Sequence, residues 1–372
     1  MTPAFPARWS ALNVALCHDW LTGMRGGERV LEILCQGFPS APIHTLIHNR
    51  AAISPVINSH CIRTSWLQGV PGILRHYRHL LPLFPAAMER FPPVAGDLLI
   101  STSHCVAKNI RTTPSTPHLC YCFTPMRYAW LFHGEYLGAN PLKRLLARPI
   151  LAWLRKNDRA ASARVRRFVA ISHHVRDRIT RFYGREADVV YPPVDLDRWT
   201  PGPAATASFD LVASALVPYK RLDLAVQAYT RMNRPLKIVG IGSEHAALQR
   251  MAGPSIEFLG WQPDARLLDL YRNCHCLVFP GEEDFGIVPL EAQACGRPVV
   301  AYAKGGALET VSPDVSGVFF QEQSVSALID AVRRAEARRW DSVAIRRQAE
   351  RFSVNQFIDG MDQSMGKVLS AC

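Results

Sequence analysis

The chain has 372 residues, of which 48% are hydrophobic and 20% are charged, and its Gly and Pro residues are scattered along it. This length predicts two domains of roughly 150 to 200 residues, and the composition excludes disordered and fibrous proteins. The net charge of +12 comes from the N-terminal half, because residues 1–195 carry 24 Lys or Arg against 11 Asp or Glu, whereas residues 196–372 carry 19 against 20.

We expect a cytoplasmic protein that does not span a membrane. No stretch approaches the roughly eighteen consecutive apolar residues of a span, and the first twenty residues lack the features of a signal peptide. The ten cysteines lie mostly in apolar segments, which predicts free thiols. Two C-x-C pairs, at 120–122 and 274–276, have the spacing of residues that share a face of a strand rather than zinc-finger spacing, so we expect no metal site.

Short apolar runs alternate with amphipathic segments, the pattern of strand–helix units with a parallel sheet. In the first half we expect strands near 13–18, 42–47, 97–101, 118–123, 167–172 and 187–191. After a Pro- and Ala-rich linker at 191–208 we expect strands near 209–216, 235–240, 255–260, 276–280, 297–302 and 317–320. The prediction is an α/β chain of two doubly wound, Rossmann-like domains, residues 1–195 and 196–372, facing each other across a ligand cleft. The last helix can pack back on the first domain.

The first candidate site is the segment CHDWLTGMRGGERVLEIL, residues 17–34. A strand is expected to end at His18, and a loop with Gly23, Gly26 and Gly27 is expected to precede a helix that begins near Glu28. Glycine there lets the backbone approach a phosphate closely. The spacing differs from the G-x-G-x-x-G of dinucleotide-binding folds.

Two further segments of the first half end strands with chemically useful side chains. In ISTSHCVAK, His104 follows one strand, and in HLCYCFTPMRYAW another strand ends at Phe123, with Arg127 and Tyr128 shortly after. For His104 two hypotheses stay open: a catalytic or substrate-positioning residue, or a hydrogen-bonded structural histidine.

The most basic part of the chain is residues 141–168, PLKRLLARPILAWLRKNDRAASARVRRF, with nine basic residues and one acidic residue. Its helix-spaced Leu, Ile and Trp residues predict a basic amphipathic surface helix. Either this face is only solvated, or it attaches to an anionic membrane surface. Nucleic acid is not an expected partner, because no nucleic-acid-binding signature accompanies the charge.

In the second half, SALVPYKRLDLAVQAY places Lys220 and Arg221 at the start of a helix. Cations there are unfavourable to the helix dipole, so their position indicates an anionic ligand such as a diphosphate.

The most specific segment is GEEDFGIVPLEAQACGRPVVAYAKGGALETV, residues 281–311. Glu283 and Glu291 flank a turn between a strand and a helix, with Gly286 in the turn. Backbone N–H groups and the positive helix end gather at such a joint, where an anion can dock. The alternative is an ordinary strand–turn–helix joint with solvated acids.

This block resembles the signature of family 4 retaining glycosyltransferases of the GT-B fold, in particular a bacterial mannosyltransferase-like group. The resemblance implies that Glu283 contacts hydroxyls of a donor sugar and that Glu291 holds the ribose hydroxyls. It also implies that the backbone meets the sugar and phosphate at Phe285, Gly286, Ile287 and Val288.

The resemblance implies roles for the other segments too. Lys220, helped by Arg221, would neutralise the leaving diphosphate, and the loop with Gly26 and Gly27 would close over it. Arg127 and Tyr128 would line the acceptor side.

The chain departs from the family pattern at two positions. Ala215 stands where relatives usually have Arg, and Phe123 stands where they commonly have His. The role of that His is therefore absent or passes to His104 or His18.

By resemblance, the function is that of a retaining, metal-independent hexosyltransferase with a nucleotide-diphosphate sugar as donor and no cofactor. Our first hypothesis is transfer of mannose from GDP-mannose to a polyprenyl-diphosphate-linked or oligosaccharide acceptor during surface-polysaccharide assembly. The acceptor would dock on the basic first domain, peripherally on the inner face of the plasma membrane. The alternatives are a noncatalytic nucleotide-sugar binder or partner subunit, and a GT-B epimerase or phosphorylase.

Overall fold

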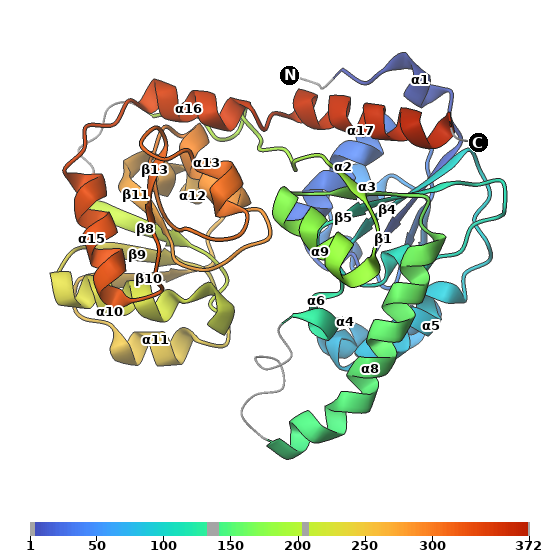
Figure 1. The fold of residues 1–372 in the computed structure, drawn as a ribbon, viewed down its shortest axis with the longest axis horizontal. Coiled ribbons are helices and arrows are strands. Elements are labelled where there is room, and N and C mark those ends of the chain that lie inside the picture. Colours follow the sequence, from blue (N-terminus) through green and yellow to red (C-terminus); the bar gives the residue numbers. More distant parts are fainter. Residues whose placement is uncertain (1–3, 132–140, 203–207, 371–372) are drawn as a thin grey trace. The chain divides into compact units, whose positions relative to one another are not determined.

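The structure is a computed structural model that describes residues 4–131, 141–202 and 208–370, and only the backbone of 141–144. The described residues divide into two units (Figure 1). The N-terminal unit contains those up to Tyr191 and those from Ile358 onward, and the C-terminal unit contains those of Pro192–Phe357.

The N-terminal unit is built on a parallel sheet of seven strands, in the order β3-β2-β1-β4-β5-β6-β7. Its strands are β1 (Val14–His18), β2 (Ile43–Thr45), β3 (Ile62–Thr64), β4 (Leu98–Ser103), β5 (His118–Cys122), β6 (Arg167–Ala170) and β7 (Ala187–Val189). The central strands β1, β4 and β5 are buried along their whole length, as expected for a parallel sheet covered on both faces. The register pairs His18 with Thr102, so the carboxyl ends of β1 and β4 lie side by side.

Helices cover both faces of this sheet (Figure 1). They are α1 (Ala7–Ser10), α2 (Gly26–Gly37), α3 (Pro55–Asn58), α4 (Ile73–His76), α5 (Phe84–Glu89), α6 (Arg127–Trp130), α8 (Pro141–Arg164) and α9 (His173–Tyr183). Short 3-10 turns lie at η1 (Arg50–Ala52), η2 (Trp66–Gly69), η3 (Tyr77–Leu83) and η4 (Ala107–Asn109). The two ends of helix α9 are explained by its local sequence. The Ser172 side chain accepts a hydrogen bond from the Val175 amide and caps the first turn, and Gly184 ends the helix in the left-handed conformation.

The C-terminal unit has a six-stranded parallel sheet in the order β10-β9-β8-β11-β12-β13. Its strands are β8 (Phe209–Ala213), β9 (Leu236–Val239), β10 (Ile256–Gly260), β11 (Cys274–Phe279), β12 (Val299–Tyr302) and β13 (Gly317–Phe320). Its helices are η5 (Pro218–Lys220), α10 (Leu222–Met232), α11 (His245–Met251), α12 (Asp264–Asn273), α13 (Ile287–Ala294), α14 (Ala307–Thr310), α15 (Val325–Glu336) and α16 (Ser342–Glu350). Because β8 and β11 are neighbours, the loops that follow them lie together.

The last helix, α17 (Val354–Leu369), begins in the C-terminal unit and continues as part of the N-terminal unit. There the Asp362 carboxylate accepts hydrogen bonds from the Arg8 guanidinium at 2.6 Å and from the Trp9 indole at 2.8 Å. These contacts attach the end of the chain to its beginning.

The alternating pattern predicted both sheets. Each of the twelve strands expected from the sequence is present, with bounds that differ by at most three residues. Strand β3 was not predicted, because it has only three residues and its central Arg63 is exposed. Within the described part of the expected linker, Trp199 is buried and packs edge-on against Tyr271 with ring centroids 5.4 Å apart.

The nine cysteines within the described residues are free, as predicted, and eight of them are buried. In the same residues there is no group of three or more His, Cys, Asp or Glu side chains arranged to hold a metal ion. None of the helices, as far as they are described, is both long and apolar enough to cross a bilayer.

Candidate functional site

In the C-terminal unit, the loops after β8 and β11 bring Lys220 and Glu283 together. The Lys220 ammonium and the Glu283 carboxylate form an ion pair, and the two side chains are only 17% and 13% exposed. Lys220 ends the 3-10 turn η5, and Glu283 follows the end of β11 by four residues. The sequence suggested both residues, but their contact depends on the adjacency of β8 and β11.

Glycines allow the two loops to approach this closely. A Cβ atom on Gly281 would stand 2.9 Å from the Cα of Lys220, which is closer than real Cβ contacts come. Gly305 has a φ of +67°, and a Cβ there would stand 2.4 Å from the Glu283 carbonyl oxygen. The Gly306 amide then donates to that carbonyl oxygen at 2.8 Å. Glycines therefore permit two close approaches here, of Gly281 to Lys220 and of Gly305 to the Glu283 carbonyl.

Arg221 lies beside this pair, and its guanidinium already has protein partners. It bonds both carboxylate oxygens of Asp223 at 3.1 Å and the Gln323 side-chain oxygen at 3.1 Å. The amide of Gln323 donates in turn to the Pro280 carbonyl at 3.0 Å. Asp223 offsets much of the charge of Arg221, as Glu283 does for Lys220, so both cations are already paired within the protein.

Helix α13 begins at Ile287, directly after this loop. Gly286 precedes it with a φ of +97° and has no side chain to cap the first-turn amides. Phe285 is buried against Phe352, with ring centroids 5.8 Å apart, while Ile287 and Val288 are partly exposed. The loop is thus anchored by an aromatic side chain at its base, next to the positive end of a helix.

Glu291 lies on the second turn of α13. Its carboxylate accepts a hydrogen bond of 2.9 Å from the hydroxyl of Tyr271, which is completely buried. Burial, together with the Glu291 carboxylate, raises the pKa of Tyr271 well above its usual range, so the phenol stays protonated and donates. Tyr271 therefore fixes the orientation of Glu291, a role that the sequence did not reveal.

In the N-terminal unit, Asp19 is the residue that organises the carboxyl ends of β1 and β4. Its buried carboxylate accepts four backbone N–H bonds of 2.6 to 3.0 Å, from residues 104–107, and lies 2.9 Å from Nδ1 of His104. Burial alone would raise the pKa of Asp19, but the charge and hydrogen bond of His104 and the amide donors lower it far below its usual range. Asp19 was not predicted as a site residue from the sequence, although an acidic residue directly after a buried strand is a usable signal.

His104 is oriented by these contacts. Its imidazole bonds Asp19, packs edge-on against Trp20 with ring centroids 4.5 Å apart, and is 30% exposed. The ring of Phe123 lies 6.5 Å away, centroid to centroid. The histidine is both hydrogen-bonded and accessible, so its geometry is compatible with both hypotheses for it.

Gly26 and Gly27 were expected in a loop, and that prediction is wrong, because α2 begins at Gly26 and both residues lie in its first turn. Neither has a positive φ. At Gly27 the missing side chain leaves room for Phe123, whose ring carbons would come within 3.3 Å of a Cβ atom. Glu28, two residues into the helix, lies 3.8 Å from Nε2 of the buried His18 and accepts from the Arg25 amide at 3.1 Å.

Arg127 and Tyr128, the expected acceptor-side residues, open the short helix α6. Both are partly buried, and Tyr128 packs against the apolar core of the N-terminal unit. Their predicted role stays a prediction, as does the cleft between the two units.

A family model matches most of the C-terminal unit. Residues 196–352 match the model described as Glycosyl transferases group 1. The matched region contains Lys220, Glu283 and Glu291.

Curated relatives of the chain are D-inositol 3-phosphate glycosyltransferases. The one from Mycobacteroides abscessus is 34% identical over 207 residues, which cover 49% of this chain and 47% of the relative. The one from Segniliparus rotundus is 28% identical over 393 residues, 96% of this chain and 76% of the relative. The chain spans about half the length of several curated relatives that it matches, including 53% of the one from Gordonia bronchialis.

Solved structures resemble the chain over nearly its full length. The lipopolysaccharide outer core galactosyltransferase WaaB in its apo form has a TM-score of 0.68 at 16% identity, covering 95% of this chain and 99% of that one. Anabaena Alr3699/HepE in complex with UDP and glucose has a TM-score of 0.65 at 17% identity, covering 97% and 100%. At these identities the likeness shows the fold, and the chain has the GT-B fold, with two Rossmann-like α/β units.

Proposed function

We propose that this chain is a retaining glycosyltransferase that moves a hexose from a nucleotide-diphosphate sugar to an acceptor. The observation that carries the proposal is the ion pair of Lys220 and Glu283, next to the uncapped start of α13. It lies within the region that matches the group 1 glycosyltransferase model.

The chemistry needs opposite charges at this place. Departure of a nucleoside diphosphate leaves negative charge on the phosphates and positive character on the sugar ring. Lys220 and the first-turn amides of α13 serve the phosphates, and Glu283 serves the hydroxyls of the sugar. Lys220 and Glu283 neutralise each other in their ion pair, so donor binding exchanges this ion pair for two separate contacts.

The proposed reaction retains the configuration of the sugar and needs no metal ion. A donor phosphate oxygen accepts the proton of the acceptor hydroxyl on the same face of the ring, so no protein nucleophile is required. Lys220 provides the charge that a divalent cation would otherwise supply.

For the donor, GDP-mannose is our first choice. UDP and UDP-glucose are the necessary comparison, because Anabaena Alr3699/HepE is known in complex with both. For the acceptor we propose a polyprenyl-diphosphate-linked sugar or an oligosaccharide of surface-polysaccharide assembly. The relatives are named for D-inositol 3-phosphate, which belongs in the same acceptor panel.

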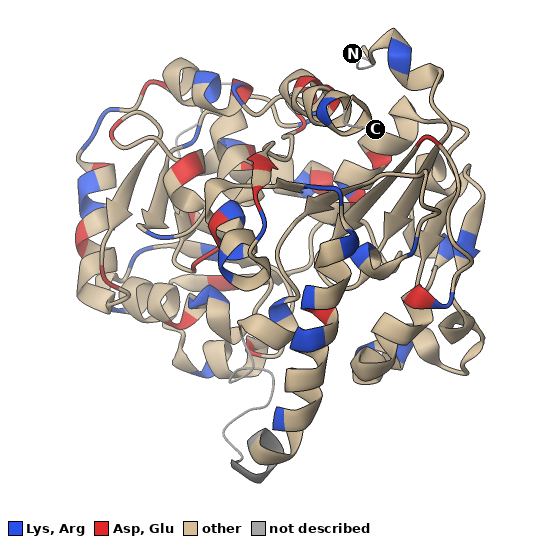
Figure 2. Ribbon diagram, turned by 45° about the vertical axis from the view of Figure 1, so that its right-hand side comes forward, with Lys and Arg blue, Asp and Glu red and all other residues tan. Residues whose placement is uncertain are grey.

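Helix α8 supports a peripheral location on the cytoplasmic face of an anionic membrane. Lys and Arg residues lie along it (Figure 2). Four large apolar side chains near its start are 45% to 65% exposed: Leu145, Leu146, Ile150 and Trp153. This combination is typical of helices that lie in the membrane interface.

A panel of nucleotide sugars tests the proposal. Each is incubated with the protein, and the thermal shift and the release of nucleoside diphosphate are followed together. The true donor should stabilise the protein and be slowly hydrolysed, and Glu283→Ala should abolish the release. Stabilisation without release in the wild type, with or without acceptor, would instead indicate a noncatalytic nucleotide-sugar binder.

A further inference from the structure

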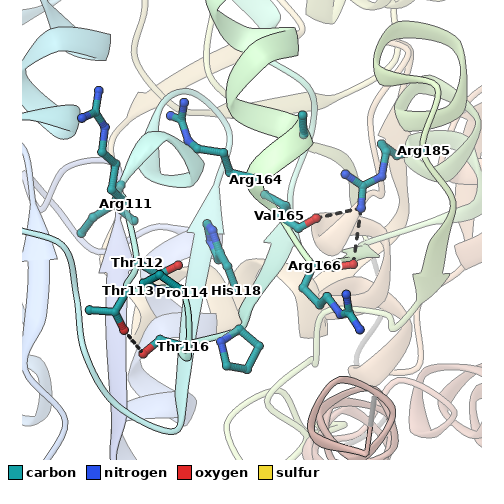
Figure 3. A pocket seen from close by; sticks show the side chains of 13 residues that line it. Arg111, Thr112, Thr113, Pro114, Thr116, His118, Arg164, Val165, Arg166 and Arg185 are labelled. Carbon is teal, nitrogen blue, oxygen red and sulfur yellow. Dashed lines mark hydrogen bonds between the residues drawn. The ribbon is translucent and has the colours of Figure 1, made fainter. Parts of the chain in front are cut away.

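The N-terminal unit has a cavity at the end of its sheet opposite to His18 and His104. The cavity has a volume of about 540 Å³, a size typical of small-molecule sites. Its walls are the loop before β5, the junction between α8 and β6, and Arg185 from the segment before β7 (Figure 3). It therefore lies at the amino ends of these strands, away from His18 and His104 at the carboxyl ends of β1 and β4.

Four arginines line this cavity, and no Asp or Glu does: Arg111, Arg164, Arg166 and Arg185. Arg111 and Arg164 extend on one side of His118, and Arg166 and Arg185 lie on the other (Figure 3). Glu89 pairs with two of these arginines and lies 2.8 Å from Arg164 and 3.7 Å from Arg111. Because four guanidinium groups and no carboxylate line the cavity, its wall is positively charged.

The frame of the cavity is fixed by hydrogen bonds. Arg185 donates to the carbonyls of Ser162 at 2.9 Å and Val165 at 2.7 Å, which caps the end of α8. The Arg166 amide donates to the His118 carbonyl at 2.9 Å. Such anchoring lowers the entropy cost of holding a ligand between these groups.

The opposite wall offers hydroxyl groups. Thr113 and Thr116 lie 2.8 Å apart, oxygen to oxygen, and Thr116 donates to the Gly96 carbonyl at 2.8 Å. Because the Thr116 hydroxyl donates its proton to the Gly96 carbonyl, it accepts a hydrogen bond from the Thr113 hydroxyl. The hydroxyls thus hold the loop of residues 112–117 in shape beside the arginines.

We infer that this cavity is a binding site for a soluble molecule that carries a diphosphate or two phosphate groups. Guanidinium groups match phosphate oxygens in geometry and stay charged at all physiological pH values. Two phosphate groups carry roughly three to four negative charges, which complements a cavity wall lined by four guanidinium groups. The site is separate from Lys220 and Glu283, which belong to the other unit, so it does not depend on the proposed function.

Calorimetric titration with inorganic diphosphate tests this site in a Lys220→Ala background, which removes the proposed diphosphate contact of the C-terminal unit. Adding Arg111→Ala and Arg166→Ala should weaken binding at least about tenfold, the effect of losing one charge-assisted hydrogen bond. Both arginines are exposed, so we expect both changes to be tolerated. The control replaces two exposed arginines of the same unit, Arg50 and Arg181, and should leave binding unchanged.

A second variant, which should strengthen rather than weaken diphosphate binding, makes the test independent of folding defects. Glu89→Gln removes the carboxylate that competes for Arg111 and Arg164, and it should strengthen diphosphate binding severalfold. Equal affinities in the starting protein, the double-arginine variant and Glu89→Gln would overturn the inference. So would flotation on phosphatidic-acid vesicles that depends on Arg111 and Arg166, because the ligand would then be a lipid headgroup.

Discussion

Lys220 and Glu283 form a largely buried ion pair although they lie in loops that follow two different strands. The ion pair thus brings together two opposite charges of the kind that the proposed sugar-diphosphate donor requires. Under the proposed function, the donor separates the two side chains, with its phosphates at Lys220 and its sugar hydroxyls at Glu283.

Replacing Glu283 by Ala should lower kcat/KM for sugar transfer by about a hundredfold or more, the usual cost of losing a group that stabilises developing charge. The matched control is Glu282→Ala, because Glu282 pairs with the half-exposed Lys304, at 3.0 Å. Steady-state kinetics should show a change of less than about threefold for that control. Equal losses in both variants would indicate a general disturbance of the loop.

Asp19→Asn should destabilise the N-terminal unit by about 3 kcal/mol. The carboxamide presents N–H donors to a loop that itself offers only N–H groups, and it leaves His104 without its anionic partner. The urea unfolding midpoint measures this loss. Asp177→Asn is the control, since Asp177 is 70% exposed and should cost less than about 0.5 kcal/mol. A small effect for Asp19→Asn would show that the buried carboxylate is replaceable.

His118 makes stability depend on pH. Burial, helped by Arg164 and Lys108, lowers its pKa to about 3 in the folded chain, against about 6.5 in the unfolded chain. The unfolded state therefore binds the proton more tightly, and stability is lost as the pH falls through 6.5 toward 3.

Between pH 7 and pH 5 the loss should be about 2 kcal/mol for His118. His44, whose pKa is lowered to about 4 by burial and by Arg63, should add a similar amount. Urea unfolding at several pH values should give a shallower slope for His118→Gln and an unchanged slope for the exposed His79→Gln. A slope that is the same in all three proteins would contradict the assignment.

Helix α8 should bind anionic vesicles through its exposed apolar residues. Leu146 is 65% and Ile150 is 45% exposed, and burying either in a membrane interface contributes about 1.5 to 3 kcal/mol. Replacing both by Ser should weaken flotation with anionic vesicles at least about tenfold. Ile241→Ser, an equally exposed residue of the C-terminal unit, is the control. Equal flotation of all variants would show that these two side chains do not bind the membrane, and no flotation of the unchanged protein would remove the membrane from the proposed function.

Local patterns in the sequence predicted twelve of the thirteen described strands, the fold class and the residues at the most specific joint. Parallel strands that are buried on both faces are continuous apolar runs, so the sequence predicts β11 directly. A turn that leads into a helix is marked by glycine, so Gly286 and the start of α13 can be predicted from the local sequence as well. Glu283 and Glu291 were identifiable for the same reason, since their positions relative to that joint are local.

Contacts between residues that are far apart in the sequence depend on the three-dimensional fold. Strand order and loop packing produce three features that local periodicity does not encode. They are the ion pair of Lys220 and Glu283, the hydrogen bonds from the amides of residues 104–107 to Asp19, and the cavity lined by arginines. The first turn of α2 shows the same limit, because the reason for a glycine at 27 is the ring of Phe123, a contact made across the sheet. Side chains that are far apart in the sequence can act on the same ligand only when the strand order of the sheet places their loops side by side.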